Sequence, residues 1–445
     1  MHYEIPGRSA QAIVNYTGLL ATCAFGFFAW LSTTGANTAL AILFLAFVLC
    51  RPAWSVCRRD PLMWLFIAFA AYVFLRTGLA IAEFPQTRQL QIKDAQNWLK
   101  LFAFWPIAWW LEGDLKRINL VLTLAVSGLM IGMLSHAEWQ SLLHMAVAKR
   151  TGFKLKVIFS GLISGTVILG LLLFAPRIWG GDKKIAPRLT QIALWLASLY
   201  LATYMLLASL SRGAWLAAAS VISVTVFIRY ALPIKTAKTS FGKMIPITLL
   251  ALAIVGGMAG LNLEKIRSRL HAESEVAASL LRGEQERLPR TSVGFRFDVQ
   301  RFGLNKWLER PLFGWGTGTT EYLIAHSDRL QLLHPSSRGG VDWMDHLHNS
   351  YLEILLRFGI IGALLLTVAA LLLINAVVRA HRAGSIPRDY FLFLLGSFGL
   401  VAIWSLFDFR ALHADWRAYW LLLAGAAYTF RLHGRSDSSP RIQPT

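Results

Sequence analysis

The chain has 445 residues, of which 56% are hydrophobic and only 15% are charged, and its mean hydropathy is +0.50. A soluble domain carries about 25% charged residues and could not bury this much apolar side chain, whereas a lipid bilayer can solvate it. The net charge of +20 comes without the interleaved basic and aromatic residues that stack on bases. The composition therefore excludes a soluble globular protein and argues against a nucleic-acid-binding one.

Apolar runs close to the roughly 20 residues that cross a bilayer as a helix recur along the chain. The three cysteines, Cys23, Cys50 and Cys57, indicate neither a disulfide framework nor a cysteine-based metal site. We predict an all-α integral membrane protein with twelve transmembrane helices, at residues 13–32, 36–52, 61–83, 98–112, 118–135, 155–176, 190–210, 213–232, 244–263, 349–378, 389–408 and 412–431.

Lys and Arg residues concentrate in alternate short connections, which is the pattern of the positive-inside rule. An orientation with both termini inside satisfies this rule best and places the one long polar segment outside. In a bacterium this means a multi-pass protein of the inner membrane with a periplasmic loop. The predicted organisation is nine spans in 1–263, the periplasmic loop in 264–348, three spans in 349–431 and a cytoplasmic tail in 432–445.

The periplasmic loop is predicted to contain two short amphipathic helices, at 273–287 and 295–310. In the second, Arg296 and Gln300 are one turn apart and share a face, whereas Arg301 lies well round from it. A plain amphipathic helix on the membrane surface would explain this composition equally well. The alternative is that one of the two arginines faces a substrate.

A very tight turn between two predicted spans carries Ser211-Arg212-Gly213, with Trp215 close behind. An arginine at the membrane edge is costly unless it is paired or reaches water, so an interfacial anchor assisted by Trp215 is one interpretation. The other is a guanidinium that binds phosphate, for which the planar fork of arginine is well suited.

The tenth predicted span opens with Asp345-His346-Leu347-His348-Asn349. A histidine at a helix N-terminus is held in the neutral form that a general base requires. The spacing of the histidines and nearby carboxylates matches no named zinc pattern, so we predict no metal. His346 is expected to cap and anchor the helix, and His348 is the stronger candidate for catalysis.

Five motifs in this order resemble the O-antigen ligase superfamily, which includes lipopolysaccharide O-antigen ligases, some O-antigen polymerases and bacterial O-oligosaccharyltransferases. Relatives often have a tryptophan four residues after the loop arginine, where this chain has Gln300. The spacing to the third motif favours Arg296 over Arg301 for the family role. The motifs are Ser211-Arg212-Gly213, Gly294-Phe295-Arg296, Pro311-Leu312-Phe313-Gly314-Trp315-Gly316, His348-Asn349-Ser350-Tyr351-Leu352 and Gly359-Ile360-Ile361-Gly362.

The resemblance implies a GT-C-like glycosyltransferase that works without a metal or other cofactor. Its donor would be a glycan on undecaprenyl diphosphate and its acceptor a sugar hydroxyl of lipid A–core, with membrane lipids around a monomer. Arg212 and Arg296 would stabilise the diphosphate, and His348 would be the general base. The resemblance further implies four substrate-binding residues: Arg301, Asn349, His346 and Trp215.

Three other functions remain open from the sequence. An O-antigen polymerase would use the same donor with a second lipid-linked glycan, and a protein O-oligosaccharyltransferase would use a protein acceptor. A transporter would carry ionisable residues deep within several spans, but the predicted spans are mostly free of them. Glu353 and Arg357 are the main exception, and their spacing predicts that they pair on one helix face.

Overall fold

The computed structural model describes residues 6–145, 147, 149–179, 185–231, 253–254, 256–271, 278–279, 281–282, 292–328, 330 and 345–433. These residues form helices and connections without a strand, which confirms the predicted all-α class. The first half contains α1 (Pro6–Phe28), α2 (Thr33–Leu49), α3 (Arg51–Cys57), α4 (Pro61–Glu83), α5 (Arg88–Leu99), α6 (Trp105–Leu111), α7 (Leu115–Leu134), α8 (Trp139–Leu143), α9 (Val157–Trp179), α10 (Ile185–Ala208) and α11 (Arg212–Ala231). The second half contains α13 (Leu263–His271), α15 (Ser292–Glu309), α16 (Thr320–Ala325), α18 (Ser350–Arg382), α19 (Arg388–Trp404) and α20 (Ala414–Leu432).

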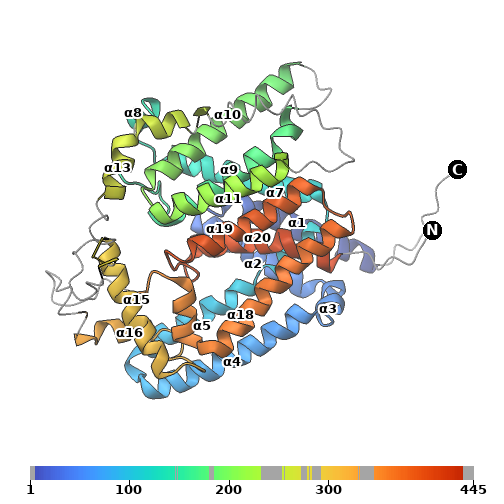
Figure 1. Ribbon diagram of the computed structural model, residues 1–445. Coiled ribbons are helices and arrows are strands. Elements are labelled where there is room, and N and C mark those ends of the chain that lie inside the picture. The colour runs from blue at the N-terminus through green and yellow to red at the C-terminus, as the bar shows by residue number, and fades with distance from the viewer. Residues whose placement is uncertain are drawn as a thin grey trace.

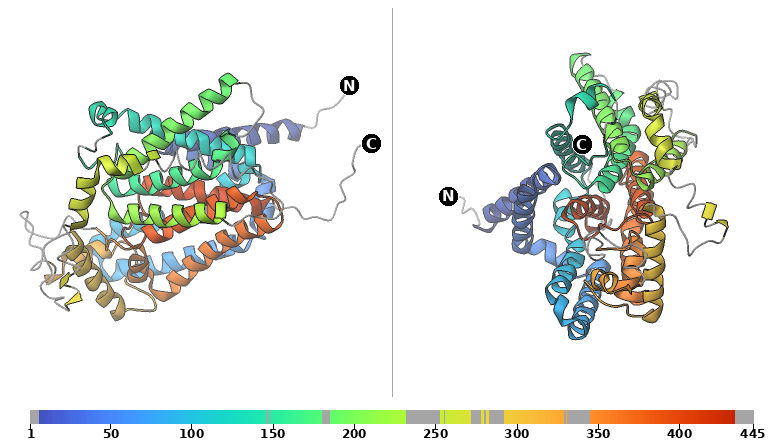
Figure 2. Two further views of the ribbon diagram at one scale, coloured as in Figure 1. Left: turned by 45° about the horizontal axis from the view of Figure 1, so that its top comes forward. Right: turned by 90° about the vertical axis from the view of Figure 1, so that its left-hand side faces the viewer.

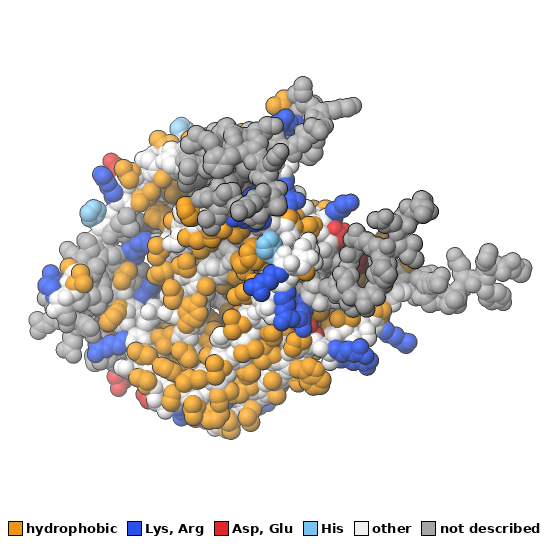
Figure 3. All heavy atoms as spheres, turned by 45° about the vertical axis from the view of Figure 1, so that its right-hand side comes forward, with side chains coloured by type: hydrophobic (Ala, Val, Ile, Leu, Met, Phe, Trp, Pro, Cys, Tyr) orange, Lys and Arg blue, Asp and Glu red, His pale blue; other side chains and the backbone are white. Residues whose placement is uncertain are grey.

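Seven of the described helices are long and apolar enough to cross a membrane: α1, α4, α7, α9, α10, α11 and α18. The pair α2 and α3, bent by 82°, adds an eighth if it counts as one broken span. Hydrophobic side chains cover the middle of the face shown in Figure 3, and Lys and Arg side chains gather towards its two ends. The chain is thus a multi-pass membrane protein, although the expected number of twelve spans is not confirmed.

One predicted span differs clearly from the structure. Residues 98–112 do not form a single helix but contain the end of α5, a 3-10 turn at Lys100–Phe102 and the seven-residue α6. Pro106 in the first turn of α6 explains the break, because proline lacks the N–H that a continuous helix needs and disfavours helix in the residue before it. Three predicted features lie partly or largely outside the described residues: the span 244–263, the loop helix 273–287 and the tail after His433.

Short polar side chains set where several apolar helices begin. Ser32, Asp60, Asp114 and Asn349 each accept a hydrogen bond from a backbone N–H in the first turn of α2, α4, α7 and α18, respectively. These bonds satisfy N–H groups that have no partner within the helix, which matters most where water is scarce. The polar residues between the apolar runs therefore determine the helix ends.

The long helices run roughly side by side, so that the bundle has two distinct ends (Figures 1 and 2). α1 begins and α20 ends at the end where α3 lies, on the right of Figure 1. The other end, on the left, holds α15, α16, the start of α18 and the connection between α19 and α20, and we call it the loop end. The packing joins distant segments, since α20 contacts both α6 and α18, and α9 contacts both α11 and α19.

A kink in α18 receives the glycine-rich segment that follows α15. Gly359 has φ of 59° and ψ of −166°, which interrupts the helix and frees backbone groups. Four backbone hydrogen bonds join this segment to the kink. The N–H groups of Trp315 and Gly316 donate to the carbonyl oxygens of Leu356 and Arg357. Those of Ile360 and Ile361 donate to the carbonyl oxygens of Pro311 and Leu312. The Pro311–Gly316 motif is therefore explained by this structural joint.

Replacing Gly359 with alanine is expected to destabilise the protein. The new Cβ would overlap the Leu312 carbonyl group, and the positive φ would add about 1–3 kcal/mol of backbone strain. The midpoint of thermal unfolding in detergent should fall, whereas Gly78→Ala in α4, where a Cβ meets nothing within 4 Å, should leave it unchanged or higher. Equal midpoints for the two variants would contradict this account of the kink.

Candidate active site at the loop end

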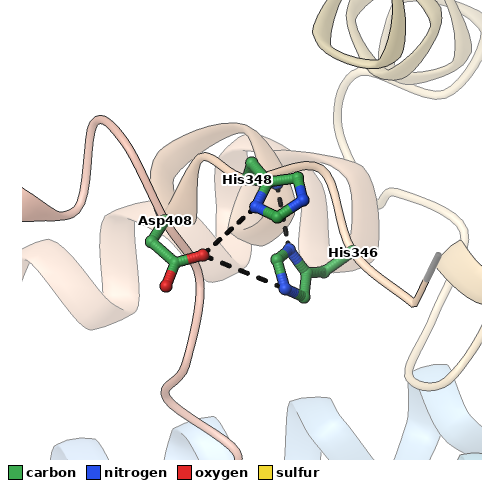
Figure 4. Close-up of side chains that lie close together, drawn as sticks. All are labelled: His346, His348 and Asp408. Atoms are coloured by element: carbon green, nitrogen blue, oxygen red, sulfur yellow. Dashed lines mark hydrogen bonds and ion pairs between the residues drawn. The ribbon is translucent and has the colours of Figure 1, made fainter. Parts of the chain in front are cut away.

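His346, His348 and Asp408 come together at the loop end, although Asp408 is 60 residues from His348 in the chain (Figure 4). The two histidines precede α18, and Asp408 lies between α19 and α20. His348 Nδ1 is 3.2 Å from Asp408 Oδ1, and His346 Nε2 is 3.9 Å from the same oxygen. His346 and Asp408 are buried, whereas His348 is partly accessible.

Local hydrogen bonds hold His348 against Asp408. The side chain of Asn349 caps α18 by accepting from the N–H groups of Tyr351 and Leu352, and His348 itself adopts a left-handed backbone with φ of 52°. Ser350 ties this turn to the opposite connection, because its Oγ donates to the carbonyl of Asp408 at 2.7 Å. The strained conformation at His348 is thus maintained by the surrounding bonds, as is common at functional sites.

A buried ionic network of Glu353, Arg357 and Asp94 supports the same turn. The Leu347 N–H donates to Glu353 Oε2 at 2.9 Å, and Glu353 Oε1 is 2.6 Å from Arg357 Nη2. Arg357 also pairs with Asp94 of α5, which accepts from the Gly318 N–H at 2.5 Å. The predicted pairing of Glu353 with Arg357 is confirmed, and the pair links the histidine turn to α5 and to the glycine-rich segment.

The charges of the cluster are set by burial and by one another. Burial raises the pKa of Asp408, but the hydrogen bond from His348 and the nearby positive groups outweigh burial, so that the pKa is lowered overall. Burial, with a further contribution from His348, lowers the pKa of His346. At neutral pH the site therefore contains an ionised Asp408 beside a neutral His346.

This arrangement suits His348 to act as a base. When Nδ1–H donates to the ionised Asp408, the proton is fixed on that nitrogen and Nε2 is left with a free lone pair. The carboxylate also stabilises the imidazolium that forms when Nε2 accepts a proton, as in an Asp-His pair of a hydrolase. The geometry thus supports general base catalysis by His348 with Asp408 as its positioning residue.

Among the described residues, the same three side chains also form a group that could hold a metal ion. One ligand atom from each lies within 4.8 Å of the others. Metal–nitrogen distances of about 2.0–2.1 Å would require these atoms to close around the ion. His346 Nδ1 already accepts from the His348 N–H at 3.1 Å, so its Nε2 is the nitrogen that could bind a metal. That no metal is needed stays an expectation from the sequence.

The tight turn with Arg212 lies beside the Asp408 connection. α10 ends at Ala208 and α11 begins at Arg212, close to the ends predicted at residues 210 and 213. A Cβ on Gly213 would lie 2.6 Å from the Cβ of Phe407, the residue before Asp408. Trp215 donates from Nε1 to the Leu206 carbonyl at 2.8 Å, so its indole stabilises the turn itself.

α15 contacts the turn that contains His348. Gln300 Nε2 is 3.4 Å from the His348 carbonyl oxygen, and Arg296 is one turn earlier on the same helix face. Arg301 Nη1 is buried and has no hydrogen-bond partner among the described residues. The structure therefore places Gly213, the residue after Arg212, against the residue before Asp408, and it places α15, which carries Arg296, against the His348 turn. Arg301 Nη1 remains without a partner among the described residues.

Asp408 and Arg410 are absent from the sequence-based candidates. They lie in the short connection between two apolar spans, where Asp408-Phe409-Arg410 places two opposite charges close together. Such charges beside a span have a functional or structural role because they are costly near lipid. That signal was present in the sequence, but nothing in it paired Asp408 with a histidine 60 residues away.

Acid is expected to destabilise the fold through His413, which precedes α20. Burial and the charge of Arg410 lower the pKa of His413 to about 4, against about 6.5 in the unfolded chain. Between these two pKa values, His413 is protonated in the unfolded state but not in the folded state. The contribution of His413 to the free energy of unfolding is therefore highest above pH 6.5 and falls as the pH decreases towards 4. His413→Gln should flatten the fall in thermal midpoint between pH 7 and pH 5, and an unchanged slope would contradict the assignment.

Comparison with known proteins gives one family match. No curated protein matches the sequence. Residues 196–367 match the family model described as O-antigen ligase, a segment that runs from α10 through the Arg212 turn and α15 into α18 and so includes Arg296 and His348. This match supports membership of the O-antigen ligase superfamily.

Proposed function

We propose that the protein is an O-antigen ligase, which transfers a glycan from undecaprenyl diphosphate to a sugar hydroxyl of lipid A–core. The observation that carries the proposal is the His348–Asp408 pair, with its 3.2 Å contact. Asp408 follows Phe407, which lies against Gly213 beside Arg212, and His348 lies against α15, which contains Arg296. A base beside arginines fits the attack of a hydroxyl on a sugar diphosphate. The site would face the periplasm in the bacterial inner membrane.

In the proposed reaction, the acceptor hydroxyl oxygen forms a bond to the anomeric carbon of the donor glycan. His348 Nε2 takes the hydroxyl proton, and Asp408 stabilises the resulting imidazolium. The bond between the anomeric carbon and the diphosphate oxygen breaks, and undecaprenyl diphosphate leaves with the bonding electrons. Direct displacement inverts the anomeric centre.

Arginines would stabilise the leaving group. Negative charge develops on the diphosphate as the glycosidic bond breaks, and fixed guanidinium groups at the membrane edge can bind its oxygens in pairs. Arg212 and Arg296 are proposed for this role. The unsatisfied donor of Arg301 makes it a third candidate, because a buried guanidinium nitrogen without a partner gains most from an anion.

Deleting the gene and examining the lipopolysaccharide tests the proposed function. Loss of a ligase should leave core-only lipopolysaccharide and accumulate lipid-linked polymer. Loss of a polymerase, which would use the same donor, should leave single-repeat caps instead. Normal lipopolysaccharide would contradict both functions.

A further inference from the structure

Two cavities share Trp30 in their linings, and the linings differ in chemistry. The first, of about 570 Å³, is lined from α1, α2, the 3-10 turn at Lys100, the segment before α9, the α19–α20 connection and α20. Neither α15 nor α18 contributes to its lining. It is therefore distinct from the surface on which Arg296 and His348 lie, although Arg410 brings it within two residues of Asp408.

The first cavity is strongly cationic. One carboxylate, Asp415, lines it together with His413, whose imidazole is neutral at pH 7. Five side chains in the lining carry positive charge: Lys100, Lys154, Lys156, Arg410 and Arg417. None of these five forms a salt bridge within the part of the chain that the structure describes.

The side chain of Arg410 is a second indication that this cavity binds an anion. Its side chain is nine-tenths buried, and its Nε and Nη2 have no hydrogen-bond partner among the described residues. Burying a guanidinium without partners is costly, and a doubly charged oxyanion would satisfy both donors. Phosphate, which presents several acceptor oxygens, fits the spacing of donors in a guanidinium.

The second cavity, of about 560 Å³, is mainly apolar and shares Trp30 with the first. It extends between α7, α9, α10, α19 and α20, and its lining on α9 runs from Ile163 to Arg177. At 1.5 Å per residue this is about 21 Å along the helix, a large part of the roughly 30 Å hydrocarbon core. Leu194 in the lining is 64% exposed, so the cavity has an edge that faces lipid.

Resting on the proposed function, we propose that the two cavities together bind the acceptor as a phosphate-bearing glycolipid. Its phosphate occupies the cationic cavity and one hydrocarbon chain occupies the apolar cavity beyond Trp30. The acceptor then reaches His348 along the Asp408–Arg410 connection, whereas the donor diphosphate binds at Arg212 and Arg296. Two lipid substrates with anionic groups thus have separate cationic sites.

A binding experiment tests the lipid site without any transfer activity. The purified chain in dodecyl maltoside is heated with dioctanoyl phosphatidic acid, dioctanoyl glycerol or inorganic phosphate at one concentration. Phosphatidic acid should raise the thermal midpoint most, because it alone supplies both the phosphate and the chains. A shift of the same size with inorganic phosphate, or with dioctanoyl glycerol, would overturn the two-part site.

Variants locate the binding. Lys154 and Lys156 are exposed, so Lys154→Gln/Lys156→Gln should fold normally and lose most of the shift caused by phosphatidic acid. Lys149→Gln is the matched control, since Lys149 is exposed near the same segment and pairs with Glu138 outside the cavity. Equal shifts in the double variant and the control would overturn the assignment of the phosphate to this cavity.

A transfer assay tests the identity of the lipid. The double lysine variant should raise KM for the phosphorylated acceptor at least tenfold while kcat and the KM for the donor stay unchanged. An acceptor from which the phosphates have been removed should show the same KM with wild type and variant. If phosphatidic acid no longer shifts the thermal midpoint of the variant but its KM for the acceptor is unchanged, the acceptor assignment is wrong. If wild type transfers no glycan, the proposed function fails and the acceptor assignment with it, while the binding experiment still decides the lipid site.

Discussion

Replacing His348 with alanine is expected to lower the rate of glycan transfer by about 10²–10⁴-fold, the usual contribution of a positioned general base. The loss should appear in kcat, because the imidazole acts on the proton that moves in the transition state. Membrane insertion should be unaffected, since the side chain is partly accessible and the turn is held by Asn349 and Ser350. Transfer measured with purified donor and acceptor checks this result.

His326→Ala is the matched control for this experiment. His326 follows α16, which lies at the loop end, but it is exposed and its ring packs at a tilt against Tyr322 in α16. Transfer by this variant should stay close to that of wild type. If His348→Ala retained near-normal transfer, His348 would not be the base.

Asp408→Asn tests the positioning residue of the same pair. The amide keeps the shape but removes the charge that fixes the proton on His348 Nδ1, so kcat should fall while the KM for the donor is unchanged. Asp408→Glu, which restores the carboxylate, should recover part of the activity. A purely structural role would instead lower the amount of folded protein for the asparagine variant.

Replacing Arg357 with methionine is expected to have the largest effect on stability. The substitution leaves the buried carboxylates of Asp94 and Glu353 without their shared counter-ion. Removing one partner from a buried ion pair costs about 3–5 kcal/mol, which is a large part of the stability of many proteins. The yield of monodisperse protein and the midpoint of thermal unfolding should both fall sharply.

Arg310→Gln is the matched control, because Arg310 forms an ion pair of the same chemistry with Glu83, in which both side chains are more than a third exposed. An exposed pair contributes about 0–1 kcal/mol, so this variant should remain close to wild type. Similar losses in the two variants would mean that burial of the Arg357 network is not the source of its effect.

The membrane class, most helix positions and several local details follow from the order of residues along the chain. Long apolar runs favour a lipid environment, and short polar residues before several of them set where the helices begin, so these features depend on local composition. The tight turn at Arg212 and the pairing of Glu353 with Arg357 were also predictable, because adjacent residues and residues four apart on a helix have fixed relative positions.

The partner of His348 depends on how the helices pack. Asp408 reaches the histidine because α18, α19 and α20 pack with their loop ends together, which no local spacing encodes. The cationic cavity is assembled from distant segments of the chain. The spacing of residues predicts which of them share a helix face. It does not predict which faces of distant helices pack against each other.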